Sequence, residues 1–120
     1  MVEVTGMPSK RPKEYGTLSF RDRQEWEQWL QLNHSSSDGI WMMFHRKELG
    51  RPGIEYREAL EEALRFGWID SIVRKLDEER YVRKFTPRKA SSRWSRTNLE
   101  IARHLMAEGR MTERGMAVLG

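Results

Sequence analysis

Basic and aromatic side chains gather in residues 66–98, FGWIDSIVRKLDEERYVRKFTPRKASSRWSRTN. Residues 80–96 include no acidic residue and hold seven basic ones: Arg80, Arg83, Lys84, Arg88, Lys89, Arg93 and Arg96. Guanidinium groups bind phosphates and carboxylates through paired hydrogen bonds, and Trp side chains stack on bases. The segment therefore predicts an exposed surface for an anionic partner, either nucleic acid or a phosphorylated ligand.

Residues 86–96 are the strongest candidate for a ligand site within this surface. Ser95 is the predicted N-cap of a helix, so its hydroxyl and the backbone N–H groups after it would attract an anion. Arg88 and Arg93 would clamp a phosphate or carboxylate, while Trp94 would cover a ring. The alternative is an ordinary helix start with Trp94 in the core and solvated Arg side chains, and the sequence leaves both open.

Asp70 is the one carboxylate in the apolar stretch FGWIDSI. Because an isolated buried carboxylate is costly, it needs an ionic or hydrogen-bonding partner. One interpretation makes Asp70 a general base or a ligand-orienting anion, with Arg88 or Arg93 stabilising an anion in an enzyme. The other is a structural ion pair with Arg83 on the neighbouring strand, or a cap on backbone N–H groups. The structural interpretation is favoured, since such pairs are common in folded proteins.

No motif for a cofactor or a metal is present. The chain has no Cys, which excludes disulfides, Cys-ligated zinc and iron–sulfur sites. GxxxxGK[ST], GxGxxG and GxSxG are all missing. His34, His45 and His104 lack the spacing of metal ligands and are expected to be ordinary surface or core residues. We therefore assign no catalytic residue, cofactor or metal from the sequence.

The periodicity of apolar residues predicts an α+β fold, with a small, mainly antiparallel sheet and three to four helices packed against one side. Residues 1–16 are expected to form a flexible arm, and residues 17–120 a single domain. The predicted strands are Thr17–Phe20 at a sheet edge, Ile40–Phe44, and a hairpin of Trp68–Arg74 and Arg80–Thr86. Predicted helices follow Ser19 as an N-cap, run over Glu55–Phe66, and follow Ser95 and Thr112.

Alternation in the predicted hairpin sets which side chains share a face. Trp68, Asp70 and Ile72 are expected on one face of the first strand. In the second strand Tyr81, Arg83 and Phe85 are expected to point one way, and Val82 and Lys84 the other.

The whole chain has 120 residues and a formal net charge of +4. A basic balance favours anionic partners. The N-terminus lacks the apolar core of a secretory signal, and no apolar run is long enough to span a membrane. We therefore expect a cytoplasmic protein of undetermined oligomeric state.

Several short motifs resemble the YdeI/OmpD-associated family, whose members are often labelled bacteriocin-protection proteins. These are ALRFGWID at 63–70, KLD at 75–77, FTPR at 85–88, Trp94-Ser95 and AEGRMT at 107–112. Upstream, Trp26, Trp29-Leu30, Asn33-His34 and GIW at 39–41 extend the resemblance over nearly all of residues 17–120. Ser71 departs from the pattern, which has Gly after WID. The resemblance implies bacterial stress resistance and no established reaction.

Three hypotheses about function follow. The leading one is a non-enzymatic binding domain whose basic hairpin and following turn engage an anionic partner, with Trp68 and Trp94 stacking or packing. The resemblance implies instead a stress-protection protein that acts through a protein partner. The third is an uncharacterised enzyme that uses Asp70 together with Arg88 or Arg93.

Overall fold

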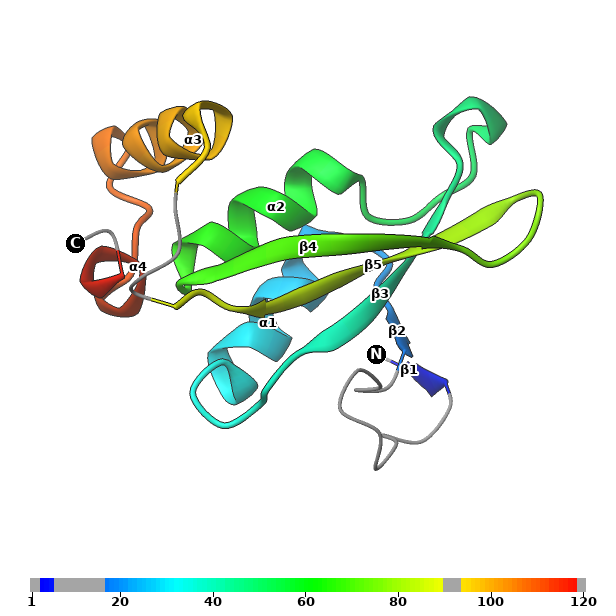
Figure 1. The fold of residues 1–120 in the computed structure, drawn as a ribbon, viewed down its shortest axis with the longest axis horizontal. Helices are drawn as coiled ribbons and strands as arrows, with labels where there is room; N and C mark the ends of the chain where they lie inside the picture. Colours follow the sequence, from blue (N-terminus) through cyan, green and yellow to red (C-terminus); the bar gives the residue numbers. More distant parts are fainter. Residues whose placement is uncertain (1–2, 6–16, 90–93, 119–120) are drawn as a thin grey trace.

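The computed structural model describes residues 3–5, 17–89 and 94–118 (Figure 1). In chain order the elements are β1 (Glu3–Thr5), β2 (Thr17–Ser19), α1 (Arg23–Asn33), β3 (Ile40–His45), the 3-10 helix η1 (Lys47–Leu49), α2 (Tyr56–Arg65), β4 (Trp68–Lys75), β5 (Arg80–Pro87), α3 (Arg96–Ala107) and α4 (Glu113–Ala117). The predicted α+β class is confirmed. Most of the predicted arm, 6–16 with residues 1 and 2, lies outside the described residues, while Glu3–Thr5 forms β1.

The five strands form one sheet in the order β1-β2-β3-β5-β4. Only the β2–β3 pair is parallel among these strands, so the sheet is mainly antiparallel as predicted. The prediction that Thr17–Phe20 lies at a sheet edge was wrong, because β2 pairs with β1 on one side and β3 on the other. The β4–β5 hairpin is confirmed, and its second strand lies inside the sheet.

Helix α1 begins later than its predicted N-cap, Ser19. That residue belongs to β2, so its backbone is committed to the sheet. Asp22 is the N-cap instead, and its carboxylate accepts a hydrogen bond from the backbone N–H of Glu25 at 3.0 Å. The N–H of Arg21 donates to Glu25 at 2.8 Å and is the chief cause that lowers the pKa of Glu25 to about 2. Short polar side chains at this position satisfy N–H groups that the helix leaves unpaired.

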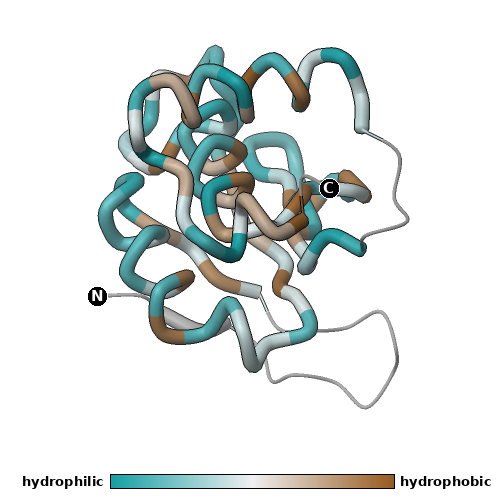
Figure 2. Tube along the Cα trace, turned by 90° about the vertical axis from the view of Figure 1, so that its left-hand side faces the viewer, coloured by the Kyte–Doolittle hydropathy of each residue, from teal (hydrophilic) through white to brown (hydrophobic). Residues whose placement is uncertain are grey.

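The main core lies between α1, α2 and one face of the sheet. Along β3, Ile40, Met42 and Phe44 are buried and alternate with partly exposed residues. They meet Trp26 of α1 and Phe85 of β5, both fully buried. Figure 2 shows hydrophobic and hydrophilic positions alternating along the helices, as expected for helices that cover a sheet on one side.

Helix α2 is fixed at both ends. At its start, Glu55 and Glu58 form a reciprocal capping box. At its end, Gly67 has φ of 76°, a left-handed conformation that Gly adopts without a Cβ clash. This turn leads directly into β4, so it sets the direction of β4 relative to α2.

The β4–β5 hairpin contains a β-bulge that changes the predicted faces. Asp70 pairs with Phe85, but the next pair towards the hairpin tip is Val73 with Arg83. One extra residue therefore lies in β4, and Val73, rather than Ile72, returns to the face of Asp70. The predicted placement of Ile72 beside Asp70 was wrong, because alternation alone does not reveal a bulge.

Helices α3 and α4 pack at the end of α2. Ser95 and Thr112 are their N-caps, as predicted, and accept hydrogen bonds from the N–H groups of Asn98 and Gly115 at 3.1 Å each. A Cβ at Gly115 would overlap the carbonyl group of Arg65, so only Gly allows α4 to approach α2 this closely. No helix in the described part of the chain is long and apolar enough to cross a membrane.

Candidate functional site

Asp70 lies in a cluster with Arg83 and Tyr56. One carboxylate oxygen of Asp70 accepts hydrogen bonds from the Arg83 guanidinium at 3.0 Å and the Tyr56 hydroxyl at 2.9 Å. The Arg83 guanidinium also lies over the Tyr56 ring, 4.0 Å from its centroid. The structure thus contains the Asp70–Arg83 ion pair that the structural interpretation predicts. Tyr56, at the start of α2, completes the cluster.

The cluster holds the Tyr56 hydroxyl protonated. Burial, followed by the negative charge of Asp70 and its hydrogen bond, raises the pKa of Tyr56 to about 12. A phenol with so high a pKa is a poor general base at neutral pH. The arrangement therefore fixes the position of the Tyr56 ring and does not activate its hydroxyl as a base.

Arg88 forms a second, separate pair with Trp94. The Arg88 guanidinium lies 3.9 Å from the centroid of the Trp94 ring. Arg88 is buried, which lowers its pKa, and its backbone N–H donates to the carbonyl of Gly67 at 2.8 Å. Trp94 packs against the apolar residues between α2 and α3, as the structural alternative expected. Arg93, the other half of the predicted clamp, lies outside the described residues.

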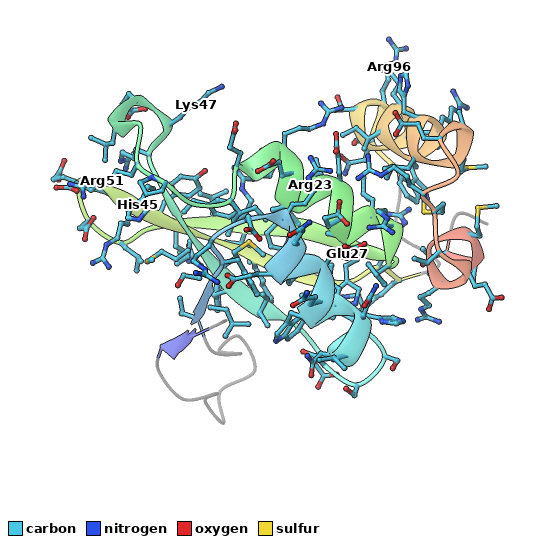
Figure 3. All side chains as sticks on the ribbon, turned by 180° about the vertical axis from the view of Figure 1, so that it is seen from behind. Arg23, Glu27, His45, Lys47, Arg51 and Arg96 are labelled. Atoms are coloured by element: carbon cyan, nitrogen blue, oxygen red, sulfur yellow. The ribbon has the colours of Figure 1, made fainter. Side chains whose placement is uncertain are left out.

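The remaining residues of the predicted surface point in different directions. Lys84 pairs across the ladder with Trp41, so it lies on the sheet face opposite Arg83. Lys89, Ser95 and Arg96 are exposed at the other end of β5 and the start of α3. In Figure 3, Arg96 lies at the opposite end of the molecule from His45 and Lys47. The structure brings together Asp70 with Arg83 and Arg88 with Trp94, but not the whole set.

A cleft of about 590 Å³ lies elsewhere, between the β3–α2 connection, the start of α2 and β5. Its lining residues come from two parts of the chain that are distant in sequence: residues 44–57, without 48 and 49, and Tyr81. Figure 1 shows this connection and the hairpin tip projecting at the same end of the molecule, away from α3 and α4. None of the residues predicted as ligand contacts lines this cleft.

Aromatic side chains form one wall of the cleft. Phe44 and Tyr81 stack with ring centroids 5.4 Å apart and an interplanar angle of 17°. Tyr56 meets Phe44 edge-on at 6.4 Å, and the Asp70–Arg83 pair holds its hydroxyl. The cluster around Asp70 thus fixes the position of Tyr56, which lines the cleft, although Asp70 does not line it.

The charged lining of the cleft is mainly basic. Arg51 pairs with Glu79 at 3.0 Å, and Arg57 pairs with Glu61 at 3.0 Å. Glu55, the one acidic residue of the lining, is engaged in the capping box of α2. Arg46 and Lys47 make no salt bridge with any residue that the structure describes. Two cations at the cleft therefore lack a countercharge from the described part of the protein.

The frame of the cleft is tied to the hairpin. The backbone N–H of Arg46 donates to the carbonyl of Glu79 at 2.8 Å, and its Nε donates to the carbonyl of Glu78 at 3.0 Å. The Arg51–Glu79 ion pair adds a second link. These contacts hold residues 46–51 against the hairpin and so fix the position of this part of the cleft wall.

Sequence reasoning missed this cleft. A signal was present, because residues 45–53, HRKELGRPG, combine four basic or ionisable nitrogen side chains with two Gly directly after a buried strand. The sequence alone does not identify a cleft there, since the contribution of Tyr56 and Tyr81 depends on tertiary packing. Within the described residues no group of three His, Asp or Glu side chains is arranged to hold a metal ion.

A buried ion network was also missed. Glu62 of α2 is 1% exposed and accepts hydrogen bonds from three Arg side chains. Arg23 and Arg110 approach it at 3.1 and 3.0 Å, and Arg65 is the third partner. These residues come from α1, α2 and the segment between α3 and α4, so the network joins elements rather than forming an open site.

Comparison with known proteins gives one family match. A family model described as a domain of unknown function (DUF8412) matches residues 18–118. No curated protein and no solved structure matches the chain. The comparisons give no support to the resemblance to the YdeI/OmpD-associated family.

Proposed function

The chain belongs to the DUF8412 family, and we propose that it is a binding domain for a small phosphorylated ligand with a planar ring, held in the cleft of about 590 Å³. The observation that carries this proposal is the pairing of an aromatic wall with Arg46 and Lys47, two cations without an acidic partner among the described residues. The proposal keeps the anionic partner expected from the sequence and moves its site.

The size of the cleft favours a small molecule over a polymer. Small-molecule sites usually occupy about 300 to 1,000 Å³ and combine apolar walls with a few polar groups. The cleft fits this description, since Tyr81 and Tyr56 supply ring surface and the β3–α2 connection supplies charge. Binding of single-stranded nucleic acid usually needs a basic groove several nucleotides long. The scattered Lys84, Lys89 and Arg96 do not build such a groove.

Each part of the ligand has a matching group. A phosphate would lie near Arg46 and Lys47, where it supplies the missing negative charge. A planar ring would pack against Tyr81, whose own position is fixed by stacking on Phe44. We assign no reaction to this site. Stress protection through a protein partner and catalysis by Asp70 stay predictions without a supporting contact at the cleft.

The test compares nucleoside monophosphates with the matching nucleosides by isothermal titration calorimetry at low and high salt. The monophosphate is expected to bind more tightly, and its affinity to fall as salt rises, because salt screens exposed charges. Lys47→Gln is expected to weaken monophosphate binding about tenfold, in the range of one charge-assisted contact.

Lys89→Gln is the matched control, because Lys89 is an exposed lysine on the surface predicted from the sequence. It should leave the affinity unchanged. A larger loss in Lys89→Gln than in Lys47→Gln would place the anion on the basic segment instead. Binding of a single-stranded oligonucleotide without binding of any monophosphate would favour nucleic acid. If none of these anions binds at low salt, the proposal is wrong.

A further inference from the structure

His45 lies where two clefts meet. Besides the cleft proposed for the ligand, a second cleft of about 430 Å³ opens along Ser19 to Arg21 and Met43. Phe44, His45, Pro52, Gly53 and Ile54 line both clefts. His45 is the one titratable residue among these five, so it is the shared lining residue that could respond to a ligand in either cleft through a change of charge.

We infer that His45 contacts the phosphoryl group of the ligand at this junction and that the bound ligand holds His45 protonated. The inference deepens the proposed function and rests on it. It also defines the ligand further: its phosphoryl group lies beside His45, and its remainder extends along the aromatic wall of the first cleft.

The two ring nitrogens of His45 differ in access. Nδ1 is buried and has no hydrogen-bonding partner among the residues that the structure describes. The ring is partly exposed and borders both clefts, so Nε2 is the nitrogen that a ligand reaches. An imidazole that donates Nε2–H to a phosphate oxygen makes a hydrogen bond in either protonation state, and the protonated state adds charge.

The groups that face His45 are mostly cationic. Arg80 stands directly opposite it in the β3–β5 ladder, and the others line the two clefts: Arg21, Arg46, Lys47, Arg51 and Arg57. Four of the six are paired with carboxylates, Arg21 with Glu25, Arg51 with Glu79, Arg57 with Glu61 and Arg80 with Asp77. Glu55, the acidic residue of the lining, is engaged at the start of α2.

A positive charge on His45 would be repelled by the cations around it, and a bound anion would offset this repulsion. An opposite charge in contact favours the protonated imidazole. Binding therefore takes up a proton from solvent, and by linkage a lower pH tightens binding. Imidazole is the side chain suited to this coupling, because it titrates between about pH 5 and 8.

The test needs a ligand whose own charge is constant, since a phosphate monoester titrates near about pH 6. The probe is the nucleoside 5′-sulfate that matches the best monophosphate. Calorimetry from about pH 5.5 to 8 is expected to show affinity falling about tenfold as the pH rises. Titrations in buffers of different ionisation enthalpy are expected to show uptake of about half a proton at the middle of this range, which is the largest uptake that a tenfold change in affinity allows.

His45→Gln is the decisive variant, because the Gln amide still donates a hydrogen bond but does not titrate. It is expected to bind with an affinity independent of pH. His104→Gln, at an exposed histidine of α3, is the matched control and should keep the pH dependence. Should His45→Gln fail to fold by circular dichroism, NMR titration of the wild-type ring replaces it, with a titration midpoint that rises on adding ligand.

The outcomes separate the two levels of inference. Absence of binding at every pH overturns the proposed function and this inference together. Binding with the same affinity across the range, pH dependence that persists in His45→Gln, or a ring midpoint unmoved by ligand overturns the role of His45 alone.

Discussion

Asp70 accepts two hydrogen bonds at a single carboxylate oxygen, and each donor side chain also makes a second contact in the structure. Arg83 stacks on the ring of Tyr56, while Tyr56 lines the cleft. A change at Asp70 is therefore transmitted to the cleft wall, although Asp70 itself does not line the cleft. Such a residue positions a binding group and need not touch a ligand.

Asp70→Asn should lower the pKa of Tyr56 from its value of about 12, because the negative charge of Asp70 contributes to raising it. It should also reduce the free energy of unfolding by about 1 to 3 kcal/mol, since Arg83 loses its countercharge in a partly buried place. Alkaline titration of tyrosinate absorbance measures the first effect, and urea unfolding measures the second.

Tyr56→Phe provides the assignment in that titration. The chain has three Tyr, at positions 15, 56 and 81, and the variant should remove the transition at the highest pH. If the highest transition persists in Tyr56→Phe, or stays in place in Asp70→Asn, the described cause of the Tyr56 pKa is incorrect.

At the scale of single residues, the sequence predicted an ion pair between two side chains more successfully than it predicted which residues line a cleft. The Asp70–Arg83 pair was expected because a carboxylate among apolar residues needs a partner and a hairpin supplies one nearby. The stacking of Arg88 on Trp94 was not predicted, since a separation of six residues in the sequence does not fix a contact. His45 was predicted to be an ordinary histidine, and its place in the lining of two clefts could not be predicted, because those clefts depend on tertiary packing.

At the scale of elements, α2 has the largest number of roles. It covers the sheet, supplies Tyr56 to the cleft and holds Glu62 in the ion network with Arg23, Arg65 and Arg110. Arg65 also donates from Nε to the carbonyl of Arg110 at 2.6 Å. The position of α3 and α4 relative to the sheet thus depends on polar contacts as well as on apolar packing.

Glu62→Ala is expected to reduce the free energy of unfolding by about 2 to 4 kcal/mol, because three guanidinium groups lose their shared countercharge. The value lies towards the low end for a broken buried pair, since the Arg side chains keep 16 to 35% of their exposure to water. Urea unfolding followed by circular dichroism measures it.

Glu108→Ala is the matched control, at a carboxylate that is 58% exposed and contacts Arg110 at 3.4 Å. It should change stability by less than about 0.5 kcal/mol. If the two variants lost the same free energy of unfolding, the burial of Glu62 would not make its ion pairs more stabilising than the exposed pair of Glu108.

Elements were predicted more accurately than their junctions. The strands β3 to β5 and the helices α2 to α4 follow from apolar periodicity and from Ser95, Gly67 and Thr112 at their ends. The bulge in β4 and the start of α1 at Arg23 were mispredicted, because both depend on which backbone groups the sheet occupies.

At the scale of the whole molecule, charge and aromatic surface are distributed between two ends. Two exposed basic residues that stand out in the sequence, Lys89 and Arg96, lie just after β5 and at the start of α3, while the cleft lies at the start of α2. Figure 3 shows Arg96 and Lys47, a residue of the cleft lining, at opposite ends of the molecule. A run of charges along the chain is thus a poor guide to a site, because strand alternation and helix packing separate its members. The net charge of +4 agrees with the proposed anionic ligand but does not locate its site.

The strand order has a kinetic consequence. Strand β5 pairs with its chain neighbour β4 and also with β3, from which it is separated by α2 and β4. Closing a long loop costs entropy before its contacts are gained, so docking of the hairpin onto β3 is expected to limit the folding rate.

Val82→Ala in β5 should therefore slow folding about two- to threefold, whereas Leu105→Ala in α3 should act mainly by speeding unfolding. Stopped-flow chevron plots separate the folding and unfolding rate constants. If both variants changed the same rate constant, docking of the hairpin onto β3 would not be the step that limits folding. The strand that anchors the cleft wall through Tyr81 would then also be the strand on which the rate of reaching the native state depends.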